Sequence, residues 1–180
     1  MTDHTANTLF EQAMSVFRRS DYQSSLGLLD QVIEREPGHK LALTTRGAAE
    51  LKLNRPDAAI ESFNRSIEID PTYARAYHMR GLALESKGDS RAALDDFAKA
   101  IELNPEYGAA YHSRANLYAK LGENELATDD ILWSQQGLVF REQFDVDSSQ
   151  GGYFDEESLA LDSIARGAAG ALVTSMLEGF

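Results

Sequence analysis

An all-α solenoid is the fold that the sequence predicts, because one helical pattern recurs at a fixed interval. Residues 74–107 (ARAYHMRGLALESKGDSRAALDDFAKAIELNPEY) read as two short amphipathic helices joined by a Gly-Asp turn and closed by a proline. The same pattern is found directly before this segment and directly after it, without a shift in register. A fixed period of this kind is typical of repeat proteins, whose units bury their apolar faces against one another.

Small residues in this central repeat lie where two antiparallel helices would have to cross. Gly81 and Ala93 would let the first and second helix approach closely. Bulky residues are expected to close around the crossing point, and these are Tyr77, Leu84 and Phe97.

Turn-forming residues mark where the helices should end. Gly88 can adopt the positive φ that often follows a helix, and Asp89 is a suitable N-cap for the next one. Pro105 cannot continue a helix and should stop the second helix. In the preceding repeat Pro56 falls near the start of a second helix, where its missing N–H costs little.

Four repeats fit the chain in phase, over residues 6–39, 40–73, 74–107 and 108–141. In the fourth repeat Val139 stands where a proline closes the other three, so we expect its second helix to run on toward residue 144.

The rest of the chain is expected to be an acidic linker, residues 142–154, followed by a C-terminal capping helix, residues 155–180. Acidic residues open the predicted helix, and apolar residues then recur at helical spacing. The apolar residues are Leu161, Ile164, Ala165, Ala168, Leu172, Val173 and Met176.

The positions that the repeats share resemble the consensus of the tetratricopeptide repeat. In the central repeat the matching residues are Tyr77, Gly81, Leu84, Ala93, Phe97, Ala100 and Pro105. The resemblance extends over residues 6–141. It implies a right-handed α-solenoid of four helix-turn-helix units that acts as a protein-interaction scaffold or adaptor.

Proteins of this family bind extended or helical peptides in a groove lined by their first helices, so the resemblance also implies a binding site. The equivalent positions here are Phe10, Met14, Phe17, Arg18, Leu41, Lys52, Arg75, His78, Leu82, His112, Asn116 and Lys120. The groove positions carry four bases and one acid, Glu85, and are apolar at one end. A peptide partner with acidic groups and one or two apolar anchors would fit such a groove.

The family's best-known ligand mode, a carboxylate clamp for the C-terminal tails of heat-shock chaperones, is not expected. Phe10 and Met14 replace a lysine and an asparagine of the clamp. Thr45 replaces a second asparagine and Met79 replaces a base, while Arg75 alone is acceptable.

Arg46, Arg80 and Arg114 recur at one position of three repeats, and acids recur with them in the second helices. The acids are Glu61, the pair Asp95 and Asp96, and the pair Asp129 and Asp130. The first repeat has Gln12 at the arginine position and lacks the acids too. We therefore expect internal ion pairs with the arginine stems packed between helices, rather than an anion-binding stripe.

His78 and His112 occupy the same position of consecutive repeats, which should place them about 10 Å apart on the groove. This separation is too large for both to bind one metal without distortion, so no metal site is expected. We expect both to contact the ligand, with weak pH sensitivity near the ordinary histidine pKa.

Composition excludes several functions. The formal charge of −12 argues against nucleic acid and anionic membranes as main ligands. The absence of cysteine excludes disulfides and thiolate chemistry, and it fits a reducing, cytoplasmic location. Neither a signal peptide nor a stretch long enough to enter and span a bilayer is evident. Without a phosphate loop, nucleophile elbow or paired-histidine motif, we expect no enzyme activity and no cofactor.

The sequence thus predicts a cytoplasmic scaffold for protein or peptide ligands. Two alternatives stay open. One is a secretion-type chaperone that holds an unfolded client. The other is a self-assembling scaffold, in which the tail or convex face of one copy docks into the groove of another, so that a homo-oligomer is possible.

Overall fold

The computed structural model describes residues 5–123 and 126–132. This part of the chain contains helices and no strand, which confirms the predicted all-α fold. Residues 126–132 form a helical segment after the last of seven longer helices. The seven are α1 (Ala6–Arg18), α2 (Tyr22–Arg35), α3 (Lys40–Lys52), α4 (Pro56–Ile69), α5 (Ala74–Ser86), α6 (Ser90–Leu103) and α7 (Gly108–Leu121).

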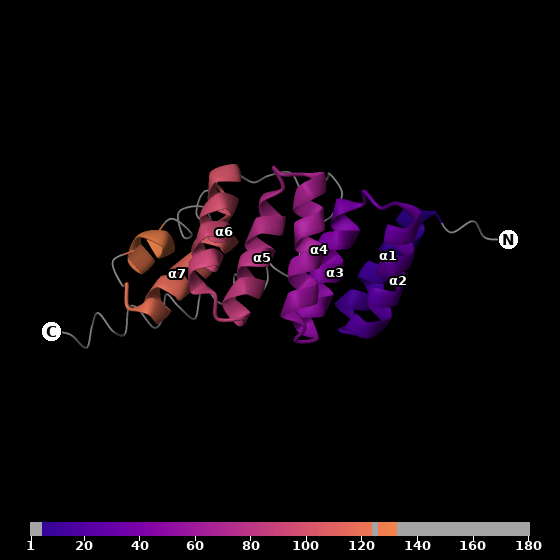
Figure 1. Cartoon of the computed structure of the whole chain (residues 1–180), viewed down its shortest axis with the longest axis horizontal. Coiled ribbons are helices and arrows are strands. Elements are labelled where there is room, and N and C mark those ends of the chain that lie inside the picture. Colours follow the sequence, from indigo (N-terminus) through magenta and orange to yellow (C-terminus); the bar gives the residue numbers. More distant parts are fainter. Residues whose placement is uncertain (1–4, 124–125, 133–180) are drawn as a thin grey trace, which may run out of the picture.

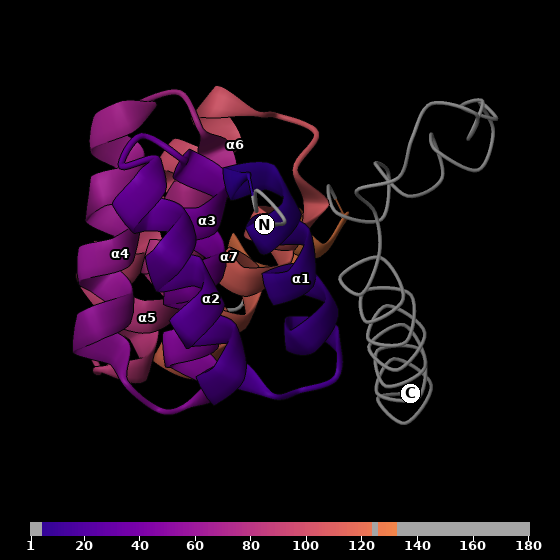
Figure 2. The same cartoon turned by 90° about the vertical axis from the view of Figure 1, so that its right-hand side faces the viewer.

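The helices form pairs that follow one another along the long axis of the array (Figure 1). The first helices begin at Ala6, Lys40, Ala74 and Gly108, which are equally spaced along the chain. Each helix packs against the next one in the chain, and successive first helices also contact each other, α1 with α3, α3 with α5 and α5 with α7. Figure 2 shows the same array from its N-terminal end. The fold is therefore a solenoid in which α1, α3, α5 and α7 make one continuous layer.

The helix ends follow the predicted turn chemistry. Gly88 has a φ of 85° after α5, and the side chain of Asp89 accepts a hydrogen bond from the backbone N–H of Ala92. Pro56 is the first residue of α4. Helix α6 ends two residues before Pro105. These four predictions are confirmed.

Two glycines set the distance between the helices of the second and third repeats. A Cβ on Gly81 would lie 2.6 Å from Cε1 of Phe97, and a Cβ on Gly47 would lie 2.5 Å from Cε1 of Phe63. Both rings are fully buried. Because each ring fills the space of a missing side chain, close helix packing depends on the pair of residues. In the first and fourth repeats the equivalent pairs are Ala13 with Leu29 and Ala115 with Ile131.

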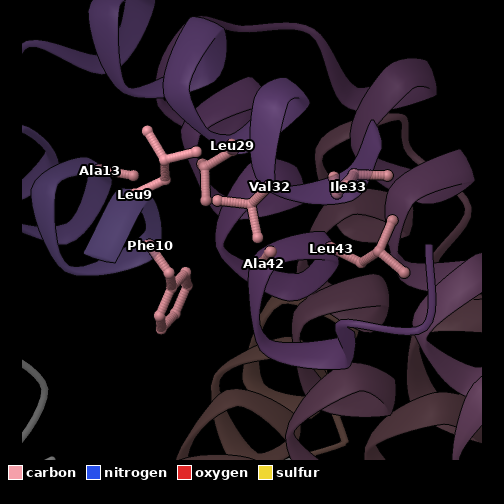
Figure 3. Close-up of a cluster of buried hydrophobic side chains, with 8 residues drawn as sticks. All are labelled: Leu9, Phe10, Ala13, Leu29, Val32, Ile33, Ala42 and Leu43. Carbon is pink, nitrogen blue, oxygen red and sulfur yellow. The ribbon is translucent and has the colours of Figure 1, made fainter. Parts of the chain in front are cut away.

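Among the described residues the hydrophobic core forms three clusters, and each cluster takes residues from two consecutive repeats. Figure 3 shows the first cluster, to which α1, α2 and the start of α3 all contribute. A repeat therefore completes its core only when its neighbour is present, as expected for a solenoid. The cluster consists of Leu9, Phe10, Ala13, Leu29, Val32, Ile33, Ala42 and Leu43.

Several predictions made from the sequence fall on residues outside the described part of the chain. These are the continuation of the last helix toward residue 144, the acidic linker of residues 142–154 and the capping helix of residues 155–180. Among the helices that are described, none has the length and apolar character needed to cross a membrane.

Candidate functional site

The candidate site lies on the layer of first helices, and we call the side chains that α1, α3, α5 and α7 carry at the predicted groove positions the first-helix face. Six of the twelve predicted residues are exposed there, and three apolar ones are half-buried. The exposed residues are Arg18, Leu41, Lys52, Arg75, Asn116 and Lys120. The half-buried apolar residues are Met14, Phe17 and Leu82.

The half-buried apolar residues belong partly to the cores of the repeats. Met14 packs against the first cluster, and the hydroxyl of Thr45 lies 3.7 Å from its sulfur. The ring of Phe17 meets the ring of Tyr22 edge-on, with 5.1 Å between the ring centroids. Leu82 packs against the cores of both the second and the third repeat. These side chains are held in place and keep only part of their surface for a partner.

Phe10 does not lie on the surface, which corrects the prediction that it anchors a ligand. Its side chain is only 5% exposed and belongs to the core of the first repeat. Its ring also packs against His39, with 4.8 Å between the ring centroids. This helix position faces the residue that closes the repeat, so burial against that residue wins over exposure.

His78, at the same position of the third repeat, is also buried rather than available to a ligand. It is 3% exposed, with Nδ1 3.0 Å from the Tyr107 hydroxyl and Nε2 2.9 Å from the Ser113 hydroxyl. Burial is the main cause that lowers its pKa from 6.5 to about 4, and the positive charge of Arg75 adds to it. The expected ligand contact and ordinary pKa are therefore wrong for His78, which instead joins α5 to α7. Sequence reasoning missed Tyr107 and Ser113, although their hydroxyl groups are natural partners for an imidazole.

His112 is half-buried and lies beside Asn116, with 3.0 Å between His112 Nε2 and Asn116 Nδ2. Burial lowers its pKa as well. Across residues 5–123 and 126–132, no three His, Asp or Glu side chains are placed to hold a metal ion.

The positive charge of the first-helix face is concentrated at its N-terminal half. Lys120 forms an ion pair with Glu85, the acid of the predicted groove. In contrast, the side chains of Arg18 and Lys52 have no ion-pair or hydrogen-bond partner among the described residues. Their charges are therefore not compensated by a direct contact there.

Ion pairs connect first and second helices, as predicted for the third and fourth repeats. Arg80 donates from Nε and Nη2 to the two carboxylate oxygens of Asp96, at 2.7 Å each. Arg114 binds Asp130 in the same two-pronged way, at 2.8 and 2.7 Å. These bonds raise the pKa of both arginines. Asp96 and Asp130 are buried, whereas Asp95 and Asp129 are exposed.

Arg46 in the second repeat has different partners, and the prediction that it pairs with Glu61 is wrong. Glu61 is exposed, whereas Arg46 contacts Glu50 at 3.2 Å and the Ser62 hydroxyl at 2.7 Å. Ser62 occupies the place of Asp96 and donates to Glu50 at 2.7 Å. In the second repeat the buried carboxylate is therefore on the first helix, α3, whereas in the third repeat it is on the second helix, α6. Burial raises the pKa of Glu50, and the contacts with Ser62 and Arg46 oppose that rise.

These arginines also reach back to the preceding repeat. Nε of Arg46 donates to Asp30 on α2 at 2.8 Å, and Nη1 of Arg80 donates to Asn64 on α4 at 2.8 Å. Each of the two side chains therefore joins three helices from two repeats. This arrangement favours a stiff array.

The fold and the layered first helices define a class of protein, the helical-repeat scaffolds for protein interactions. Three models of the tetratricopeptide repeat match the chain, over residues 10–74, 74–107 and 97–129. The chain belongs to the tetratricopeptide repeat family, and the resemblance inferred from the sequence is confirmed.

Solved structures with the same fold include several of MamA. One MamA crystal structure is 20% identical, has a TM-score of 0.71 and covers 79% of this chain and 84% of that chain. MamA 41-end from Desulfovibrio magneticus RS-1 is 20% identical, has a TM-score of 0.69 and covers 78% of this chain and 79% of that one. At this identity the likeness shows the fold alone.

A third similar structure is the first TPR of Spaghetti (RPAP3), which is bound there to the HSP90 peptide SRMEEVD. It is 20% identical, has a TM-score of 0.63 and covers 68% of this chain and 97% of that chain. A comparison with curated proteins found no match.

Proposed function

We propose that this protein is an interaction scaffold that holds a peptide segment of a partner on its first-helix face, and that it acts by binding rather than catalysis. The main observation behind this proposal is that Arg18, Lys52 and Arg75 are exposed on this face, in a chain whose formal charge is −12. Exposed Leu41 and half-buried Met14 add apolar surface beside these bases. Such a surface favours an acidic peptide with one or two apolar anchors.

The proposed mechanism is presentation of a surface that is already formed. Buried rings opposite Gly47 and Gly81 fix the helix spacing, and Arg46 and Arg80 tie consecutive repeats together. A stiff scaffold loses little conformational freedom on binding, so most of the ordering cost falls on the peptide.

The structure of the RPAP3 domain supports an acidic ligand, because the peptide SRMEEVD bound to it is acidic. We do not expect the same clamp here. Phe10 and Met79 are buried in this chain, two further clamp positions hold Met14 and Thr45, and only Arg75 fits the clamp. The ligand proposed for this protein is therefore an internal acidic segment that needs no free C-terminal carboxylate.

Selection of peptides from a displayed random library on the intact protein would test this function. We expect acidic sequences with an apolar residue to be enriched. Affinities of synthetic copies, measured by fluorescence anisotropy, should fall by about tenfold or more in the double variant Lys52→Glu with Arg75→Glu. The control double variant is Arg65→Glu with Arg91→Glu, which makes the same charge change at exposed sites on α4 and α6.

Equal affinity of the selected peptides for both double variants would contradict the proposal, and so would a selection that enriches no sequence. Two further measurements separate the alternatives. Light scattering that rises with concentration, without any peptide, would favour self-assembly. Suppression of the aggregation of unrelated unfolded proteins, with no preferred sequence, would favour a chaperone.

A further inference from the structure

Two bases of the first-helix face differ from the others in being unpaired among the described residues. Arg18 is the last residue of α1 and Lys52 is the last residue of α3, and both are exposed. Lys120, at the equivalent place on α7, is neutralised by Glu85. Arg75 lies at the opposite end of its helix, close to the start of α5. An anionic ligand would therefore find an open pair of charges between the first and second repeats.

The fold fixes how far apart these two charges lie. Arg18 and Lys52 occupy equivalent positions of consecutive repeats, on first helices that contact each other. The contact between Thr45 and Met14 shows that side chains of α1 and α3 meet along this face. Axes of packed helices are about 8–10 Å apart, so the roots of the two side chains are separated by about one helix spacing.

Apolar side chains lie beside this pair of charges. Met14 precedes Arg18 by one helical turn, and Ala48 precedes Lys52 by one turn, so each pair shares a helix face. Both apolar side chains are half-buried. Across α1 and α3 a basic row, Arg18 and Lys52, therefore lies next to an apolar row, Met14 and Ala48.

An extended peptide can match both rows at once. In the polyproline II conformation the chain advances about 3.1 Å per residue with three residues per turn, so side chains three apart share a side and lie about 9 Å apart. Two acidic residues at this spacing would reach Arg18 and Lys52 together. A side chain between them points to another side and can lie over the apolar row.

We propose that Arg18 and Lys52 form a subsite for two carboxylates carried three residues apart on an extended peptide, with an apolar side chain between them over Met14 and Ala48. The subsite rests on the proposed peptide-binding function and states the ligand class more narrowly.

The dipole of a helix also favours a base at its C-terminal end, which could explain Arg18 and Lys52 without any ligand. Arg35 provides the matched control, because it is the exposed last residue of α2 and also has no partner among the described residues. It differs from Arg18 and Lys52 in lying on a second helix.

Three labelled peptides of identical composition test the spacing on the full-length protein by fluorescence anisotropy. GSDALDSG places its acids three apart, GSDLDASG two apart and GDSALSDG five apart. We expect GSDALDSG to bind about tenfold more tightly than the other two. Arg18→Glu and Lys52→Glu should each remove this preference, and Arg35→Glu should keep it. The double variant Arg18→Glu with Lys52→Glu should instead prefer a peptide with lysines three apart, GSKALKSG.

Equal affinity for the three spacings would overturn the inference, and so would an equal loss of affinity with Arg35→Glu. Either result leaves the proposed function standing if library-selected peptides still depend on Lys52 and Arg75. A library that yields no binding sequence would refute the proposed function itself.

Discussion

The ring of Phe97 occupies the space that a side chain on Gly81 would need, with Cε1 of the ring 2.6 Å from the position of the missing Cβ. The carbonyl oxygen of Ala93 also lies close to that position, at 3.2 Å. In the first repeat the equivalent residues are Ala13, which is larger than glycine, and Leu29, which is smaller than phenylalanine. In both solutions a larger residue on one helix is matched by a smaller one on the other.

Gly81→Ala should therefore destabilise the protein. Overpacking a buried site costs about 1–3 kcal/mol, and the better helix propensity of alanine returns up to about 1 kcal/mol. We expect the free energy of unfolding, measured by urea denaturation, to fall by about 1–2 kcal/mol. Adding Phe97→Leu, which reproduces the pair of the first repeat, should recover part of this loss.

Gly27→Ala is the matched control, because Gly27 is exposed within α2 and a Cβ there has no atom within 4 Å. This change should stabilise the protein by up to about 1 kcal/mol. If Gly81→Ala is also neutral or stabilising, the helices can separate more easily than the buried ring implies.

The ion pair of Arg80 with Asp96 joins two partners of unequal exposure. The side chain of Asp96 is 8% exposed and that of Arg80 is 25% exposed. Arg80→Met should lower the free energy of unfolding by about 2–4 kcal/mol, because it leaves a buried carboxylate without its charged hydrogen bonds. Asp96→Ala should cost less, about 1–2 kcal/mol, because the guanidinium can reach water. Chemical denaturation of both variants would show which of them has the lower free energy of unfolding.

The first repeat again supplies the control, with Gln12 and Leu28 in the places of Arg80 and Asp96. The double variant Arg80→Gln with Asp96→Leu should be more stable than Arg80→Met alone, since no charge is left unpaired. A double variant less stable than both single variants would mean that the ion pair itself stabilises the array.

The fold was predictable because its signals are local and repeated. A glycine that faces a buried ring, a proline after each of the first three second helices and an N-capping aspartate were all readable from the repeat period. The partners of Arg46 were not readable, since two changes compensate each other in space. Ser62 stands on α4 where the third repeat has the carboxylate of Asp96, and Glu50 on α3 supplies a carboxylate to Arg46 instead.

The candidate site was less predictable for a similar reason. The period shows which residues occupy equivalent positions, but burial depends on the residue that packs against each one. Phe10 and His78 were predicted on the groove, yet His39 covers the first and Tyr107 the second. The pairing of Lys120 with Glu85 likewise depends on two adjacent first helices, so only the structure separates it from Arg18 and Lys52.

The buried His78 should make stability depend on pH in a defined window. Its pKa is about 4 in the folded protein, against 6.5 for an ordinary histidine. Between these values the unfolded chain binds a proton that the folded chain does not, so stability falls as the pH is lowered. His112, whose pKa burial also lowers, adds to this effect. Glu50 opposes it, because its raised pKa favours proton uptake by the folded state.

We expect His78 alone to lower the free energy of unfolding by about 2 kcal/mol between pH 7 and pH 5. Urea denaturation at several pH values would measure this slope. Asp70 affects stability in a separate pH range. Its contact with Lys40 lowers its pKa to about 2, so the stability that it contributes is lost only as the pH falls below the ordinary aspartate pKa of 3.8.

His78→Thr, which copies Thr44 at the equivalent position of the second repeat, removes the titrating group. This variant should be less stable at pH 7, because it leaves a cavity beside Phe97 and frees the hydroxyls of Tyr107 and Ser113. Its stability should nevertheless vary less between pH 7 and pH 5 than that of the unaltered protein. A slope that persists in His78→Thr and disappears in His112→Gln would assign the pH dependence to His112 instead.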